Sequence, residues 1–303
     1  MENLSLLFKN ARAGNKPALA QILTLIEKGI DKHQLYEQLY RLSRQIYTVA
    51  FMGPAGVGKS SLLGHLILPF ARYQHVGMIA IDPRSSRLGG AFLGDRLRLA
   101  HRIHHPRVFF RSFAPRLSPF SGFITASLMA RAFEAAGYGS VIVETPGTGQ
   151  HEWSFESLAD TRILLLSPES GDEFQMMKRG LLESADIFVI NKCDRPGAKS
   201  LETALQRETH ETAHAGQWKR PIILTNALSG EGTDALFEMI EKHQQHLKKS
   251  AELEKRRSES FKAESLLWAL TLVWQKTREK ENAIKGKNAY EAGRKIIREL
   301  IRG

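Results

Sequence analysis

The stretch GPAGVGKSS, Gly53 to Ser61, is the strongest indication of the fold class in this sequence. It matches G-x-x-x-x-G-K-[ST], the pattern of a phosphate-binding loop. In such a loop the glycines let backbone N–H groups turn toward phosphate oxygens, the lysine reaches the outer phosphates, and the hydroxyl binds Mg²⁺. The sequence therefore predicts a nucleoside triphosphate site between a strand and a helix. The expected phosphate-binding residues are Gly53, Pro54, Ala55, Gly56, Val57, Gly58, Lys59, Ser60 and Ser61.

Seven short β-rich runs alternate with longer helical stretches around this loop. Several of the runs are apolar throughout, as expected for strands that are buried on both faces. The alternation predicts an α/β fold, with a mostly parallel sheet flanked by helices. The runs begin at Tyr47, Val76, Arg107, Ser140, Thr161, Asp186 and Pro221.

Helical patterns flank this region on both sides. Apolar residues at helical spacing predict helices over 16–30 and 31–45, with Asp31 as the cap of the second. We expect an N-terminal helical segment over 1–45, a P-loop domain over 46–248 and a C-terminal helical arm over 249–303. The charged run Lys248–Lys262 is typical of a solvated helix face or a linker. The apolar run Leu266–Trp274 fits either packing on the main domain or a subunit interface.

Composition limits the class of protein. The chain has 303 residues, a net charge of +11 and one cysteine, Cys193. One cysteine excludes a disulfide framework and suits a reducing compartment. No secretory signal or membrane-length apolar run is apparent, so we expect a cytoplasmic protein without a membrane partner. The charge would suit a nucleic-acid partner, but no basic motif with interleaved aromatic residues occurs, which makes nucleic acid unlikely.

A second motif predicts the base. Asn191, Lys192 and Asp194 form N-K-x-D at the end of a predicted strand. A carboxylate there can accept hydrogen bonds from N1–H and the exocyclic amine of guanine, and adenine offers no such pair of donors. The stretch TNALSGEG follows the next predicted strand, where a second base-contacting loop is expected. The prediction is therefore GTP, with the second loop supplying Asn226, Ala227 and Leu228.

Carboxylates at two further strand ends predict the metal site. Asp82 and Glu144 would lie at the carboxyl edge of a parallel sheet, where ligands bind in open α/β folds. With Ser60 they are the expected ligands of Mg²⁺. The motif ETPG, which begins at Glu144, is also typical of a switch that senses a γ-phosphate. We expect Gln150 to orient the attacking water, and Lys59 and Glu144 to take part in catalysis.

Taken together, these motifs resemble the MeaB/ArgK GTPases, the metallochaperones of adenosylcobalamin-dependent acyl-CoA mutases. The resemblance rests on the order GPAGVGKSS, DPRSSRLGG, VETPGTGQ and GDEFQMMKRG…NKCD, and it runs from about Gly14 to about Lys249. It implies a homodimer with a C-terminal dimerisation arm. It also implies GTP hydrolysis that gates cofactor loading and protects the mutase, which would be methylmalonyl-CoA mutase or a sister enzyme.

The resemblance places a third switch at Asp172, Gln175 and Lys178, and Lys178 is expected to act in catalysis when the partner docks. Departures lie mainly in the switches: Met176 replaces a glycine of the third switch, and Asn226 replaces a serine of the second base loop. Three other interpretations remain open. They are a GTPase that matures nickel enzymes of the urease or hydrogenase type, for which HRIHH at 101–105 gives thin support, a nucleic-acid-associated GTPase, and an amino-acid transport kinase.

Overall fold

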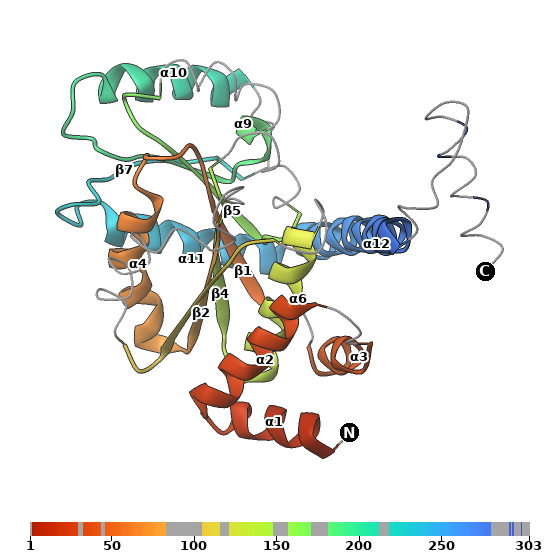
Figure 1. Ribbon diagram of the computed structural model, residues 1–303. Coiled ribbons are helices and arrows are strands. Elements are labelled where there is room, and N and C mark those ends of the chain that lie inside the picture. The colour runs from red at the N-terminus through yellow and green to blue at the C-terminus, as the bar shows by residue number, and fades with distance from the viewer. Residues whose placement is uncertain are drawn as a thin grey trace.

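The molecule is built on a seven-stranded sheet in which every described strand pairing is parallel (Figure 1). The computed structural model describes residues 2–29, 33–43, 46–82, 105–115, 121–147, 157–170, 181–211 and 218–279, together with 291, 293 and 298. The strand order is β3-β2-β4-β1-β5-β6-β7. The strands are β1 (Tyr47–Met52), β2 (Val76–Ile81), β3 (Val108–Phe113), β4 (Ser140–Glu144), β5 (Thr161–Leu166), β6 (Ile187–Ile190) and β7 (Ile222–Leu224). The predicted α/β class is confirmed, and all seven predicted strands are present.

Helices cover both faces of the sheet. Helices α4 (Lys59–Tyr73) and α11 (Thr233–Lys249) lie on one side, and α6 (Ser121–Ala135) lies on the other (Figure 1). Along β1 the side chains alternate, so that Val49 and Phe51 pack with α4 and α11. Ala50 and Met52 point the opposite way, toward α9 (Leu181–Ser184) and α10 (Ala198–Glu211). Burial on both faces explains why the strand runs are apolar without alternation.

The N-terminal helices pack on α6. They are α1 (Glu2–Arg12), α2 (Lys16–Lys28) and α3 (His33–Leu42). Asn15 caps α2, because its side chain accepts a hydrogen bond from the N–H of Ala18. The helix predicted over 16–30 ends earlier, at Lys28, since Gly29 takes a left-handed conformation (φ 66°) and its N–H bonds to the carbonyl of Leu25. The predicted cap Asp31 lies outside the described residues.

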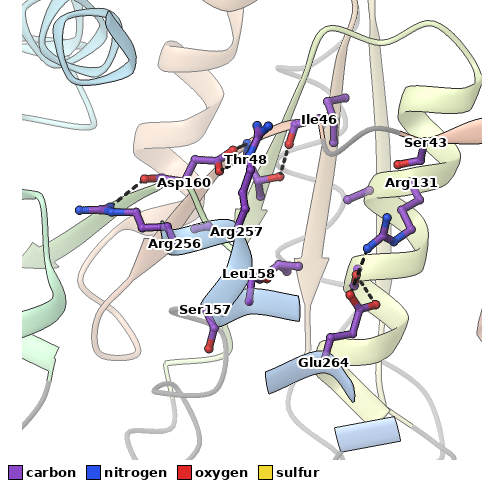
Figure 2. Close-up of a pocket in the computed structure, with 14 residues that line it drawn as sticks. Ser43, Ile46, Thr48, Arg131, Ser157, Leu158, Asp160, Arg256, Arg257 and Glu264 are labelled. Atoms are coloured by element: carbon purple, nitrogen blue, oxygen red, sulfur yellow. Dashed lines mark hydrogen bonds and ion pairs between the residues drawn. The ribbon is translucent and has the colours of Figure 1, made fainter. Parts of the chain in front are cut away.

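The long C-terminal helix α12 (Glu252–Glu279) is fastened to the main domain by ion pairs. Arg256 donates to both carboxylate oxygens of Asp186, at 2.7 and 2.8 Å. Farther along α12, the buried carboxylate of Glu264 accepts hydrogen bonds from Ser127 (2.8 Å) and Arg131 (3.1 Å) on α6. Figure 2 shows Arg131 and Glu264 facing each other. Both residues line a cavity of about 50 Å³.

The expectation that Lys248–Lys262 is a solvated face or a linker is wrong for its arginines. Asp160 and Asp186 are both buried. The Asp160 carboxylate accepts a hydrogen bond from the N–H of Thr48 on β1, and the Asp186 carboxylate accepts one from the N–H of Arg162 on β5. Burial raises the pKa of the Asp160 carboxyl, and Arg257, at 3.4 Å, and the Thr48 N–H act in the opposite direction. Arginines on α12 are therefore needed to balance carboxylates that hold the starts of two strands.

The apolar run Leu266–Trp274 is divided between the interior and the surface. Leu267 and Trp268 pack against the core that α2, α3 and α6 share. Leu266 is 62% exposed and Leu272 is 52% exposed. Packing on the main domain is thus confirmed for part of the run, and the subunit interface stays a prediction. No helix within the described ranges is long and apolar enough to cross a membrane.

Candidate functional site

The predicted phosphate loop joins β1 to α4 at the carboxyl edge of the sheet. Gly53 has φ 132°, and a Cβ there would lie 2.2 Å from the carbonyl oxygen of Leu165. Gly58 has φ 98°, and a Cβ there would lie 2.3 Å from Nδ2 of Asn191. Both positions therefore require glycine. Ala55 and Gly56 are exposed at the tip of the loop. Gly58 is the N-cap of α4, and the N-terminus of this helix favours an anion.

Lys59 lies beneath this loop and is only 6% exposed. Its Nζ donates to the carbonyls of Gly53, at 2.6 Å, and Pro54, at 2.9 Å. The ammonium group is thus held inside the curve of the loop, where it can exchange a carbonyl for a phosphate oxygen.

The ETPG motif lies directly against the phosphate loop. Gly147 has φ 72°, and a Cβ there would lie 2.7 Å from Lys59 Nζ and 2.9 Å from the Ala55 backbone N. Only glycine can bring this backbone so close to the loop. The contact places the candidate switch where it can sense an anion in the loop.

The two candidate metal-binding carboxylates lie at the ends of neighbouring strands, β2 and β4, and the candidate hydroxyl, Ser60, lies in the first turn of α4. Glu144 is level with Phe51 of β1 on one side and with Ala80 of β2 on the other. The Ser60 hydroxyl donates to the Glu144 carboxylate, so these two predicted ligands are in direct contact. Asp82 follows β2 and accepts a hydrogen bond from Ser112 of β3. One hydroxyl and two carboxylates are hard oxygen donors, and they fit Mg²⁺.

Asn191 connects the phosphate loop to both predicted base loops. Its buried side chain donates from Nδ2 to the Val57 carbonyl at 2.8 Å. Its Oδ1 accepts from the Ala227 N–H at 2.9 Å and from the Thr225 hydroxyl at 3.2 Å. One amide therefore sets the spacing between the place for the phosphates and the place for the base.

Asp194 is held in position by the second base loop. The Asn226 amide donates to Asp194 Oδ1 at 3.0 Å, and its own oxygen accepts from the Leu228 N–H at 2.9 Å. The side chain of Leu228 is 81% exposed, so it forms an open rim of the site. The asparagine that departs from the family pattern thus orients the carboxylate expected to read guanine.

Four predicted residues cannot be compared with this geometry. Gln150, Asp172, Gln175 and Lys178 lie outside the described residues. Two residues of the site were missed from the sequence: Thr225, which bonds Asn191, and Glu169, which pairs with Lys192 at 2.6 Å. Glu169 follows β5, the neighbour of β6, so knowledge of the strand order would have placed it next to the N-K-x-D loop.

The family described as "Methylmalonyl Co-A mutase-associated GTPase MeaB" matches residues 19–283 of this chain. The chain belongs to the MeaB family. A protein of Pyrococcus horikoshii that is named as a GTPase is 40% identical over 266 residues, which cover 85% of this chain and 83% of that protein. The mitochondrial methylmalonic aciduria type A homolog of Caenorhabditis briggsae is 30% identical over 281 residues, with 84% and 67% covered.

Solved structures agree on the fold. The crystal structure of a LAO/AO transport system kinase superposes with a TM-score of 0.68 and covers 100% of this chain and 99% of that chain, at 23% identity. At that identity the likeness concerns the fold. Membership of the MeaB family identifies the chain as a P-loop GTPase.

Proposed function

We propose that this MeaB-family protein binds GTP with Mg²⁺, hydrolyses it slowly, and uses the nucleotide state to gate cofactor loading of an adenosylcobalamin-dependent acyl-CoA mutase and to protect that mutase. Methylmalonyl-CoA mutase is the proposed partner, since the family description names its association with that enzyme. The observation that carries the nucleotide assignment is the Asn191 side chain, which joins the phosphate loop at Val57 to the base loop at Ala227.

In this proposal the phosphates lie on the loop from Gly53 to Ser61, where Lys59 neutralises the outer phosphates. Ser60, Asp82 and Glu144 would hold Mg²⁺, and the bound ion would supply positive charge to stabilise the phosphate oxygens during transfer. Gly147 senses the γ-phosphate through its contact with Lys59 and Ala55. Gln150 orients water, and Lys178 acts within the third switch together with Asp172 and Gln175.

Asp194 reads guanine in this proposal, and Lys192, Asn226, Ala227 and Leu228 border the base. The carboxylate is already oriented by Asn226, so little ordering is needed when the base binds. Adenine would leave the carboxylate without its two donors, which disfavours ATP strongly.

The base assignment is tested by substituting Asp194→Asn. The amide donates where guanine also donates, so affinity for GTP should fall at least roughly 100-fold, and xanthosine triphosphate should become the preferred ligand. Competition binding against a fluorescent guanine nucleotide measures both effects. Asp234→Asn, an exposed carboxylate in the first turn of α11, is the matched control. Equal displacement of GTP by ATP from the unmodified protein would contradict the guanine assignment.

We further propose that the protein is a homodimer joined through α12. Apolar side chains exposed on this helix support the proposal, and they are Leu266, Leu270, Leu272, Val273 and Trp274. The proposed division of the chain is an N-terminal helical segment over 1–45, a P-loop domain over 46–248 and a C-terminal helical arm over 249–303. The ion pairs of Arg256 and Glu264 make the first half of the arm part of the main domain's fold.

A further inference from the structure

The turn that carries Asp194 is held at both ends by a single carboxylate. The N–H of Arg195 bonds to the carbonyl of Lys192 at 3.0 Å, which closes a turn with Asp194 inside it. Glu169, on the bend that follows β5, accepts a hydrogen bond from Lys192 Nζ at 2.6 Å. Its other oxygen contacts the Arg195 guanidinium. The residues on either side of Asp194 are therefore tied to the neighbouring strand's loop.

The backbone of this turn needs such support. Lys192 has φ 57°, and it is the one non-glycine residue with positive φ within the described ranges. A left-handed conformation is unfavourable for a residue with a Cβ and persists where surrounding contacts impose it. Contacts on the turn include those of Glu169, the Asn226 amide on Asp194, and the Cys193 N–H, which bonds to the Thr225 carbonyl at 3.1 Å.

The ion pair is accessible to water and so can open. The side chain of Lys192 is 27% exposed and that of Glu169 is 45% exposed. Pairs of this kind are weak and sensitive to salt. Because this pair is weak and supports a strained turn, its loss should shorten the time for which the turn holds Asp194 in place. The rate that this would change is the dissociation rate of the nucleotide.

We propose that Glu169 is a positioning residue that prolongs the residence of bound guanine nucleotide by bracing the turn that presents Asp194. The inference rests on the proposed guanine site. Losing the brace should mainly raise the dissociation rate, because changes at a formed interface act chiefly on dissociation.

The test measures dissociation of the fluorescent nucleotide N-methylanthraniloyl-GDP, chased with excess GDP, from the unmodified protein and from Glu169→Gln. The amide keeps the size of the side chain and removes its charge. We expect dissociation to be about threefold to fivefold faster, with little change in association. Glu202→Gln is the matched control, because Glu202 pairs with Lys199 on α10 at 2.8 Å and has no described contact with the turn.

The salt dependence of dissociation distinguishes an electrostatic effect of Glu169 from an effect of its packing. Between about 0.01 M and about 1 M salt the screening length falls from about 30 Å to about 3 Å, so the ratio of the two dissociation rates should approach one. An unchanged rate in Glu169→Gln, an equal increase in Glu202→Gln, or a ratio that is the same at both salt concentrations would overturn the inference. If the unmodified protein failed to bind the probe, the proposed function itself would fail, and the inference with it.

Discussion

Replacing Arg256 with methionine should destabilise the protein without weakening its nucleotide site. Arg256 is 12% exposed and donates to both oxygens of Asp186, which is 6% exposed. Methionine keeps the aliphatic stem and removes the charge, so Asp186 would keep its burial but lose its main counter-charge. Breaking a buried ion pair from one side typically costs about 3–5 kcal/mol. For a chain of 303 residues that corresponds to a fall in melting temperature of roughly 5 to 8 °C.

Thermal and denaturant unfolding measure this loss, and two further variants and one binding measurement show whether it is specific. Lys262→Met removes an exposed charge from the same helix and should change stability by less than about 0.5 kcal/mol. Asp186→Asn combined with Arg256→Met should recover much of the stability, because the amide still accepts the Arg162 N–H without carrying charge. GTP affinity should stay within about twofold of the unmodified protein, since Asp186 precedes β6 and the nucleotide site lies at its other end. A loss below about 1 kcal/mol in Arg256→Met would show that Asp186 does not depend on this ion pair.

Two further predictions concern a glycine and a buried histidine. Gly147→Ala should lower GTP hydrolysis at least roughly tenfold, because its Cβ would lie 2.9 Å from the backbone N of Ala55 and 2.7 Å from Lys59 Nζ. The control Gly137→Ala shares the positive φ without any atom within 4 Å and should retain turnover. Equal turnover in both variants would contradict the switch role. Burial lowers the pKa of His243 from 6.5 to about 4, and Asp186 partly offsets this shift. Below pH 6.5 the unfolded state therefore binds a proton that the folded state does not bind. The free energy of unfolding should fall by on the order of 3 kcal/mol as the pH decreases from 6.5 to 4, and it should keep its full value above that window. Denaturant unfolding measures the free energy of unfolding across this pH range. Its slope against pH should be smaller in His243→Gln than in the unmodified protein, and an equal slope would contradict the lowered pKa of His243.

The strands and both nucleotide motifs could be predicted because local patterns encode them. An apolar run buried on both faces, a phosphate loop and N-K-x-D each occupy consecutive residues, so their chemistry can be recognised without the rest of the fold. The helix end at Gly29 was misplaced by two residues, since Ile30 continued the apolar pattern beyond the cap.

Residues that act across the fold could not be predicted. The charges of Arg256 and Arg257 were interpreted as solvated because their partners, Asp186 and Asp160, are far away in the sequence. Glu169 and Lys192 are likewise brought together only by the neighbouring positions of β5 and β6. Periodicity reports which side of a helix is polar, and it does not report that a polar residue will meet a buried partner.

GTP turnover, measured with and without an adenosylcobalamin-dependent methylmalonyl-CoA mutase, tests whether this protein serves that enzyme. The protein alone should turn over slowly, and saturating mutase should accelerate hydrolysis at least roughly tenfold by ordering the switches. Lys59→Ala should abolish both rates, which shows that the activity belongs to this phosphate site. A turnover rate that stays the same with saturating methylmalonyl-CoA mutase, and with sister acyl-CoA mutases, would contradict the account.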